Sequence, residues 1–476
     1  MNRIILILLL IMSSVTAYAQ SGDRQQFIRT QAPVIALNNV RIIDGTGAAP
    51  LEDQTIVIRG GKIDLIGPTA ATTIPAGAEN IDLKGYTVMP GLVGMHNHLF
   101  FPMGGSPPIY SDMAISFPRL YLALGVTTIR TTGSVAPFTD LEAKRLIDTG
   151  RMIGPKMHIT APYLEGKGSF TPVMHELKDV EDARKQVNFW ADQGATSFKA
   201  YMNISRDELR AAVEEAHKRG LKVTGHLCSV GFKEAAEIGI DNLEHGLFAN
   251  SEYVKDKKPD QCPPNASASL IDLDINGPEV KETIRVLVAK KVAITSTLPV
   301  FEASAPIAQN GIGAARAVLN PRVLAVMSED ARIRYLSSRA RIPANSPVAG
   351  LIRKAMDFER AFVQAGGLLV TGLDPTGNGG VVAGFGDHRC VQLLVEAGFT
   401  PLDAIKIATL NGAKFLGEDS KIGSIAAGKQ ADLMVIKGNP AANIADIEKV
   451  EIVFKDGVGW DTEKLIQSVQ GTIGVR

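Results

Sequence analysis

The sequence is poor in cysteine, carries no excess of either charge and has no long apolar run after its first few residues. Its 476 residues include three cysteines, an odd number, so at least one stays unpaired in an exported protein. The 50 basic and 50 acidic residues cancel, and no basic stripe or acidic tail stands out. We therefore expect no nucleic-acid or polyanionic partner and, past the N-terminal segment, no membrane span.

The first 19 residues read as a secretion signal. Arg3 gives a short positive region, and the nine apolar residues Ile4 to Met12 are too few to cross a bilayer. Ala17-Tyr-Ala is the small-x-small pattern that precedes a cleavage point. We expect cleavage after Ala19 and a periplasmic or secreted protein, with an uncleaved anchor as the alternative. No cysteine follows the cut, which argues against lipoprotein attachment.

Two stretches of short strands flank a long middle part. Residues 20–88 alternate β-branched runs with turns, and Gly60-Gly61 between two such runs is a hairpin signal. Residues 418–476 repeat this texture. We therefore expect both ends of the mature chain to build one small, composite β-sandwich domain.

The middle part, residues 89–417, alternates strands with helices. In one clear unit, Ser205 and Glu208 form a capping box, and Gly220 supplies the helix stop before the next strand. Such alternation predicts an α/β fold with a parallel sheet, most simply a closed TIM-like (β/α)8 barrel.

Six polar residues share one placement in the expected barrel. Each stands at, or within two residues of, the end of a run that reads as a strand: His96, His98, Lys199, His226, His245 and Asp374. The C-terminal ends of barrel strands open onto the face that carries the active site. Four imidazoles, a lysine and a carboxylate that converge there have the chemistry of a two-metal hydrolase. Histidines satisfied within the core are the plainer interpretation of the His-x-His pair.

Each of these side chains has a role in such a site. His96 and His98 alternate along a strand, so both face the same side and can reach one metal. Burial among cations lowers the pKa of a lysine, and a neutral Lys199 amine can react with carbon dioxide to a carbamate that bridges two metals. Neutral imidazoles suit zinc, with manganese, cobalt or iron as alternatives. Asp374 can take a proton from the attacking water and give it to the leaving group.

The chain resembles a known family in several sequence motifs. It looks like a member of the amidohydrolase superfamily, in its imidazolonepropionase-like and prolidase-like branch. The motifs that carry the resemblance are Met89-Pro-Gly-Leu-Val-Gly-Met-His-Asn-His, Gly125-Val-Thr-Thr-Ile-Arg, Thr224-Gly-His, Asn242-Leu-Glu-His-Gly, Thr371-Gly-Leu-Asp-Pro, Ala408-Thr-Leu-Asn-Gly-Ala and Gly423-Ser-Ile-Ala-Ala-Gly-Lys-Gln-Ala-Asp-Leu. The resemblance implies a TIM-like barrel with a composite β-sandwich. It also implies one metal on His96, His98 and Asp374, a second on His226 and His245, and carboxylated Lys199 between them.

Four further residues are candidates for substrate contacts. Tyr201 stands two residues after Lys199. Its side chain either faces the mouth of the barrel or is a packing residue. Arg130 ends the second strand and pairs either with a substrate carboxylate or, as we prefer, with an internal acid. His175 lies in the region where prolidase-like relatives carry a Gly-Gly-His loop, which is not visible here. His388 follows the eighth strand and reaches either the pocket or the surface.

Three long loops fall on the expected catalytic face, and two cysteines lie near it. The loops are residues 99–117, 247–277 and 302–348, and such loops form lids or substrate pockets. Cys228 and Cys390 each stand two residues after a histidine, so they are either thiolate ligands or small packing residues.

The leading hypothesis is an exported binuclear metal hydrolase that cleaves a C–N bond in an amide, dipeptide, N-acyl amino acid or cyclic amide. The same site serves an esterase, lactonase or phosphotriesterase, since a fold does not select among them. The third hypothesis is a non-catalytic binding protein on the same fold. The expected partner is a small-molecule substrate. The sequence does not decide whether the chain forms a homo-oligomer.

Overall fold

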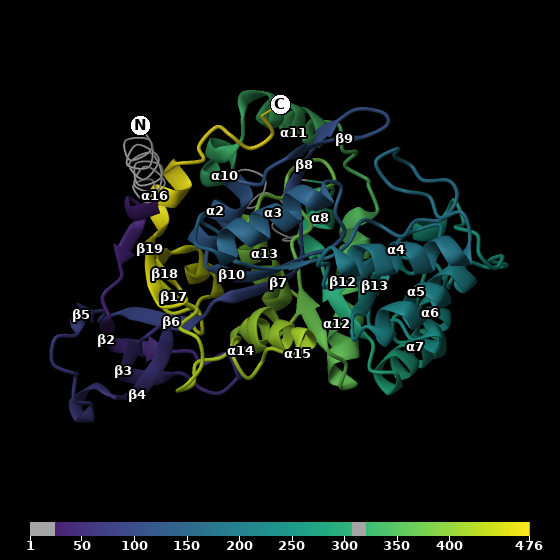
Figure 1. The fold of residues 1–476 in the computed structure, drawn as a ribbon. Helices are drawn as coiled ribbons and strands as arrows, with labels where there is room; N and C mark the ends of the chain where they lie inside the picture. Colours follow the sequence, from purple (N-terminus) through teal and green to yellow (C-terminus); the bar gives the residue numbers. More distant parts are fainter. Residues whose placement is uncertain (1–23, 307–319, 476) are drawn as a thin grey trace, which may run out of the picture.

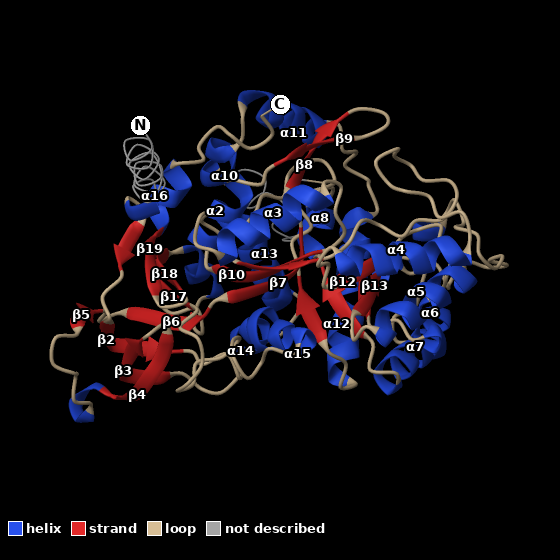
Figure 2. Cartoon of the chain, viewed as in Figure 1, coloured by secondary structure: helices blue, strands red, loops and turns tan. Residues whose placement is uncertain are grey.

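We describe the protein from a computed structural model that covers residues 24–306 and 320–475 (Figure 1). The predicted secretion signal and its cleavage point lie outside these residues. The chain forms a barrel of parallel strands wrapped in helices, with a separate sheet at one side (Figure 2). None of the helices in the described ranges has the length and apolar character to cross a lipid bilayer.

Eight parallel strands of the described chain line the barrel in sequence order. They are β7 (Leu92–Asn97), β10 (Val126–Thr131), β11 (Lys156–Ile159), β12 (Ser197–Ala200), β13 (Lys222–Gly225), β14 (Asn242–Glu244), β15 (Ala293–Ser296) and β16 (Leu369–Thr371). The first three form one sheet and the last five another. A parallel bridge between Thr160 and Ser197 joins the sheets, and Asp374 N donates to His96 O at 3.0 Å on the other side. The predicted TIM-like barrel is confirmed.

Helices between the strands cover the outside of the barrel. They are α2 (Ser116–Ala123), α3 (Pro137–Asp148), α4 (Val180–Asp192), α5 (Arg206–Lys218), α6 (Phe232–Ile238), α7 (Pro278–Ala289), α12 (Val348–Gln364), α13 (Phe385–Glu396), α14 (Pro401–Lys406) and α15 (Gly412–Leu416). The capping box of Ser205 and Glu208 starts α5, because each of their side chains accepts a hydrogen bond from the other's backbone N–H. The apolar face of α5, including Leu209 and Val213, is buried against the barrel.

The two ends of the chain share one nine-stranded sheet. It joins β1 (Ile28–Thr30), β2 (Val34–Ile42), β3 (Leu51–Arg59), β4 (Lys62–Pro68), β5 (Glu79–Asp82) and β6 (Tyr86–Pro90) to β17 (Leu433–Lys437), β18 (Val450–Lys455) and β19 (Val458–Asp461). Two antiparallel strand pairs link the halves, β6 with β17 and β1 with β19. A separate apolar core that includes Ile35, Ile56 and Phe454 holds this sheet together. Since β6 leads directly into β7, the sheet anchors the first strand of the barrel.

The long loops at the strand ends carry structure of their own. After β7 comes a hairpin of β8 (Phe100–Gly104) and β9 (Ile109–Asp112). After β14 come the short turns η2 (Gly246–Ala249) and η3 (Ala266–Leu270), and after β15 come α8 (Leu298–Glu302), α10 (Pro321–Val326) and α11 (Glu329–Ala340). Figure 1 shows α11 beside the β8–β9 hairpin, above the barrel.

Candidate metal centre

The six polar residues predicted from the strand ends lie in one pocket. His96 is the fifth residue of β7, Lys199 the third of β12, and the others follow the ends of their strands. His245 and Asp374 have positive φ angles of 67° and 51°, a backbone conformation that residues other than glycine rarely adopt. Such local strain persists where surrounding structure enforces it, and it gathers at functional sites.

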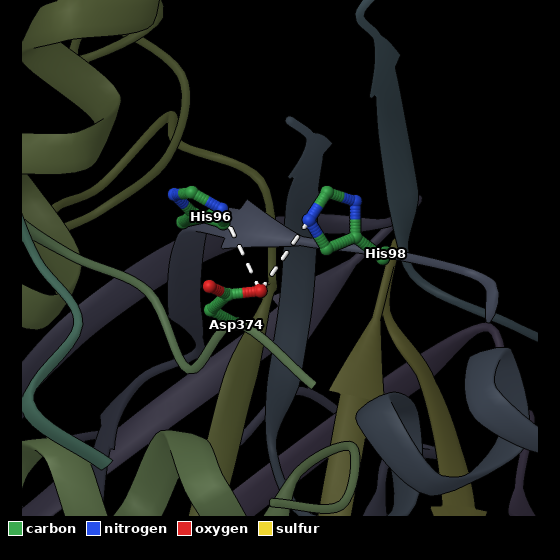
Figure 3. Close-up of side chains that lie close together, drawn as sticks. All are labelled: His96, His98 and Asp374. Carbon is green, nitrogen blue, oxygen red and sulfur yellow. Dashed lines mark ion pairs between the residues drawn. The ribbon is translucent and has the colours of Figure 1, made fainter. Parts of the chain in front are cut away.

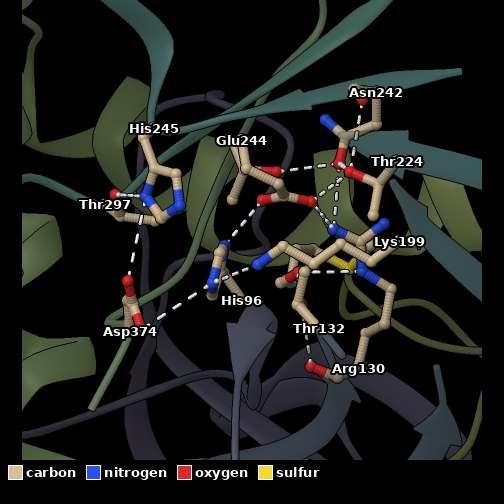
Figure 4. A network of polar contacts seen from close by, with 12 residues as sticks. His96, Arg130, Thr132, Lys199, Thr224, Asn242, Glu244, His245, Thr297 and Asp374 are labelled. Atoms are coloured by element: carbon tan, nitrogen blue, oxygen red, sulfur yellow. Dashed lines mark hydrogen bonds and ion pairs between the residues drawn. The ribbon is translucent and has the colours of Figure 1, made fainter. Parts of the chain in front are cut away.

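The Asp374 carboxylate lies among three of the imidazoles. Its Oδ1 atom is 3.8 Å from His96 Nε2 and 3.6 Å from His98 Nε2 (Figure 3). Its Oδ2 atom is 3.8 Å from His245 Nδ1 (Figure 4). Ligand atoms of His96, His98 and Asp374 all lie within 4.8 Å of one another. The rings of His226 and His245 are 4.4 Å apart between centroids, and the Lys199 amine is 3.3 Å from His96 Nε2.

A buried acid holds His96 in place. Glu244 Oε2 is 2.7 Å from His96 Nδ1, which leaves Nε2 directed toward Asp374 (Figure 4). The other Glu244 oxygen accepts from Arg130 Nη2 at 2.6 Å and contacts the Thr224 hydroxyl. Glu244 and Arg130 are fully buried, so this ion pair is shielded from water. A carboxylate behind a histidine fixes the tautomer and orientation of a metal-binding ring.

Two other imidazoles are also held through Nδ1. His98 Nδ1 is 3.0 Å from the Gly133 carbonyl oxygen, and His245 Nδ1 is 2.7 Å from the Thr297 hydroxyl. In each ring the Nε2 atom is left for another partner. The same pattern in three histidines favours an ordered ligand set over rings that only fill space.

Burial sets the charge of these side chains. Burial, together with the neighbouring Lys199, lowers the pKa of His96 and His98 well below the ordinary range, and that of His226 to about 3. Burial also lowers the pKa of Lys199 to about 8 and raises that of Asp374 to about 6. The histidines are therefore neutral near pH 7, and part of the lysine is an unprotonated amine.

This donor set fits metal ions. Neutral imidazole nitrogens and a carboxylate are ligands that zinc and similar divalent ions take. His96, His98 and His245 are buried, His226 is partly buried, and the four rings lie close together in one pocket. We conclude that the residues present suit a metal centre.

The amidohydrolase family model matches residues 87–458, more than three quarters of the sequence and all six site residues. The chain belongs to the amidohydrolase family. Members of this family are metal-dependent hydrolases, in agreement with the donor set described above.

Curated relatives match over part of the chain. An uncharacterised protein of Mycobacterium tuberculosis is 28% identical over 213 residues, which cover 43% of this chain and 55% of that protein. The imidazolonepropionase of Paenarthrobacter aurescens is 32% identical over 139 residues, covering 29% of this chain and 32% of the enzyme. The chain thus spans about half the length of the first of these relatives and a third of the second.

A solved structure matches over nearly all of the amidohydrolase chain. A candidate prolidase from Bifidobacterium longum is 25% identical with a TM-score of 0.67, and the match covers 92% of this chain and 100% of that one. The agreement of fold extends over both the barrel and the composite sheet.

The amidohydrolase pocket has a volume of about 290 Å³ and an aromatic wall. Phe100 and Tyr110 come from the β8–β9 hairpin, Tyr163 and Phe170 from the loop after β11, and Tyr201 from the end of β12. The Tyr201 ring is 4.9 Å from the ring of His226, between centroids. An apolar group next to the metal centre would contact these rings.

The other sequence candidates lie outside this pocket. Arg130 is 1% exposed and pairs with Glu244, the internal acid that we preferred for it. His175 is exposed and pairs with Asp182 at 3.0 Å. His388 is buried on α13, where its Nε2 atom is 2.6 Å from the Leu124 carbonyl oxygen. Of the four candidates for substrate contacts, only Tyr201 lines the pocket.

The two cysteines considered as ligands have other roles. Cys228 forms a disulfide with Cys262, so its sulfur is not a thiolate ligand. Cys390 is free, buried and 3.8 Å from the Ser296 carbonyl oxygen. Burial raises the pKa of this thiol, which fits a packing residue rather than a ligand.

Sequence reasoning missed the acid behind His96 and most of the aromatic wall. Glu244 stands inside the Asn242-Leu-Glu-His motif, and a charged residue within an apolar strand was the available signal. Tyr110 and Phe170 lie in loops, whose paths across the barrel mouth local sequence does not specify.

Proposed function

We propose that this chain is an exported, binuclear metal-dependent hydrolase that cleaves the C–N bond of an amide. The observation that carries the proposal is the convergence of four neutral imidazoles, a lysine and a carboxylate in one buried pocket. His96, His98 and Asp374 would hold one ion and His226 and His245 the other. When bound, such ions would supply an activated water and a Lewis acid for the carbonyl oxygen.

The chain's own residues would do the rest. A buried Lys199 with a pKa of about 8 offers a free amine that carbon dioxide can convert to a carbamate, whose two oxygens suit a position between two cations. Asp374 has a pKa of about 6, near the range in which a carboxylate passes a proton efficiently at neutral pH. Its carboxylate would take the proton of the attacking water and deliver it to the leaving nitrogen.

Amide cleavage is favoured by the relatives. The matched Bifidobacterium longum protein is a candidate prolidase, and the matched Paenarthrobacter aurescens enzyme is an imidazolonepropionase. In the pocket, the aromatic wall offers an apolar surface for the group attached to the scissile bond. Hydrolysis of an ester or lactone by the same centre is the second outcome that an assay has to distinguish.

Export is supported by the Cys228–Cys262 disulfide. It joins the loop after β13 to the long loop after β14 across 34 residues. Disulfides form and persist in oxidising compartments such as the periplasm. Sequencing the N-terminus of the protein recovered from the periplasm or medium tests this part, with a start at Gln20 as the expected result.

The activity is tested with purified mature protein loaded with zinc. We expect hydrolysis of some N-acyl amides or dipeptides, with no turnover by Asp374→Asn. Esters and lactones with the same acyl groups serve as the comparison. Turnover of esters alone would move the function to an esterase, and turnover of neither by a metal-loaded protein would contradict the proposal.

A further inference from the structure

A second hollow lies beside the active-site pocket and has a different character. Its volume is about 430 Å³, and it opens between the β8–β9 hairpin and helix α11. The floor includes Gly377 and Asn378, in the segment that follows β16. Gly377 also lines the active-site pocket, so the two hollows meet at this residue.

The segment that joins the hollows starts at the catalytic carboxylate. Thr376 donates to Asp374 Oδ1 at 2.8 Å and lines the active-site pocket. Gly377 is the next residue and has a φ of 61°. The turn that begins at Asp374 therefore contributes lining residues to both hollows.

Two arginines give the second hollow its charge. Arg334 lies on α11, Arg341 follows its C-terminal end, and the described residues that line the hollow include no aspartate or glutamate. Arg334 Nη2 is 3.7 Å from the sulfur of Met103, and neither arginine forms an ion pair with any residue of the described chain. Two guanidinium groups without an acidic partner are suited to a carboxylate, which they bind through paired hydrogen bonds.

The active-site pocket lacks such a group. Among the described residues that line it, Lys199 is the only lysine or arginine, and it lies within the cluster of metal ligands. The remaining wall is largely aromatic. The second hollow thus places two arginines, beside apolar residues such as Phe101 and Ile333, next to a pocket that has no arginine among its described lining residues.

We propose that Arg334 and Arg341 form an anion subsite that binds a carboxylate on the substrate, several bonds from the scissile amide. This inference rests on the proposed amide hydrolysis and names its substrate class. The substrate carries an apolar group at the aromatic wall and a carboxylate that reaches across Gly377. Arg334 and Arg341 determine specificity and do not take part in the chemical step.

The test uses benzoyl amides of ω-amino acids of increasing chain length, each paired with its neutral carboxamide. We expect the acid to exceed its carboxamide at least about tenfold in kcat/KM at one chain length, since a hydrogen bond to a charged group is of that strength. The Arg334→Gln/Arg341→Gln protein should lose this preference and hydrolyse the carboxamides as before. Arg332→Gln, an exposed arginine on the same helix outside the hollow, is the matched control.

The outcomes separate the two proposals. Equal turnover of acid and carboxamide at every length, or a preference that survives in the double variant, would overturn the subsite while amide hydrolysis stands. If no amide is turned over, the proposed function fails, and calorimetric binding of the same pairs to the zinc-loaded protein decides on the subsite. Tighter binding of the acid, lost in the double variant, supports it, and equal affinities overturn it.

Discussion

Glu244→Gln is the substitution that probes the support of the metal centre most sharply. Glutamine keeps the shape of the side chain and removes its charge. Glu244 contacts His96 Nδ1 at 2.7 Å and Arg130 Nη2 at 2.6 Å, and all three side chains are buried. The change therefore alters the orientation of a metal ligand and leaves a buried guanidinium without its counter-charge.

Both effects have expected magnitudes. Removing one partner of a buried ion pair destabilises a protein by about 3–5 kcal/mol, because the other charge stays buried and unpaired. Loss of the carboxylate behind a ligating histidine weakens metal binding about 10- to 100-fold. We expect Glu244→Gln to show both losses.

Glu302→Gln is a matched control. Glu302 also forms a buried pair with an arginine, Arg389, at 2.6 Å, but it contacts no histidine of the described site. Arg389 keeps a second acid, Glu396, at 2.7 Å, so we expect a smaller loss of unfolding free energy in urea. Zinc affinity, measured in a competition with a chelating dye, should be unchanged. If Glu244→Gln kept wild-type zinc affinity, or if Glu302→Gln lost as much affinity, the assigned role of Glu244 would be wrong.

Three further predictions concern the disulfide, the buried Glu359 and Lys199. Replacing Cys228 and Cys262 together by serine removes a cross-link over 34 residues and should lower the unfolding free energy by about 3–4 kcal/mol; an unchanged urea midpoint would contradict this. Burial raises the pKa of Glu359 from 4.5 to about 8. Between pH 4.5 and pH 8 the folded chain therefore keeps a proton on this carboxyl group, whereas the unfolded chain has lost it. Stability should fall by at most about 5 kcal/mol as the pH rises from 4.5 to 8, and Glu359→Gln should flatten that slope. Lys199→Ala should lose metal and activity together, with partial rescue by a small carboxylic acid; full metal occupancy without rescue would exclude the carbamate.

The position of the metal centre could be predicted because barrel topology determines it. Parallel strands that follow each other around a barrel end on one face, so residues such as His96, His226 and Asp374 converge although up to 278 positions separate them. This inference needs strand ends only and tolerates errors of one or two residues in each boundary. The order of the eight strands was also readable from the alternation of strands and helices.

The contacts around the centre could not be predicted in the same way. His388 stands close to the eighth strand in sequence, but helix α13 turns its ring toward Leu124. His175 lies in a loop and pairs with Asp182 at the surface. Local sequence does not determine the path of a loop over the barrel mouth, since packing against distant residues decides it.

The disulfide and the identity of the acid that pairs with Arg130 were missed for a related reason. Cys262 lies in a long loop, and only the folded path of that loop brings it to Cys228. Glu244 and Arg130 are on strands β14 and β10, which are not neighbours in the barrel, and their side chains meet inside it. The alternation of side chains along a strand predicts which of them point into the barrel. It does not predict which residue of another strand each one contacts there.

The most direct test of the account is the metal content of the active, purified chain, measured together with amide turnover as zinc is titrated into the metal-free protein. We predict activity that rises to a plateau at about two ions per chain. Full amide turnover at one ion per chain would contradict the binuclear centre and the bridging position of Lys199.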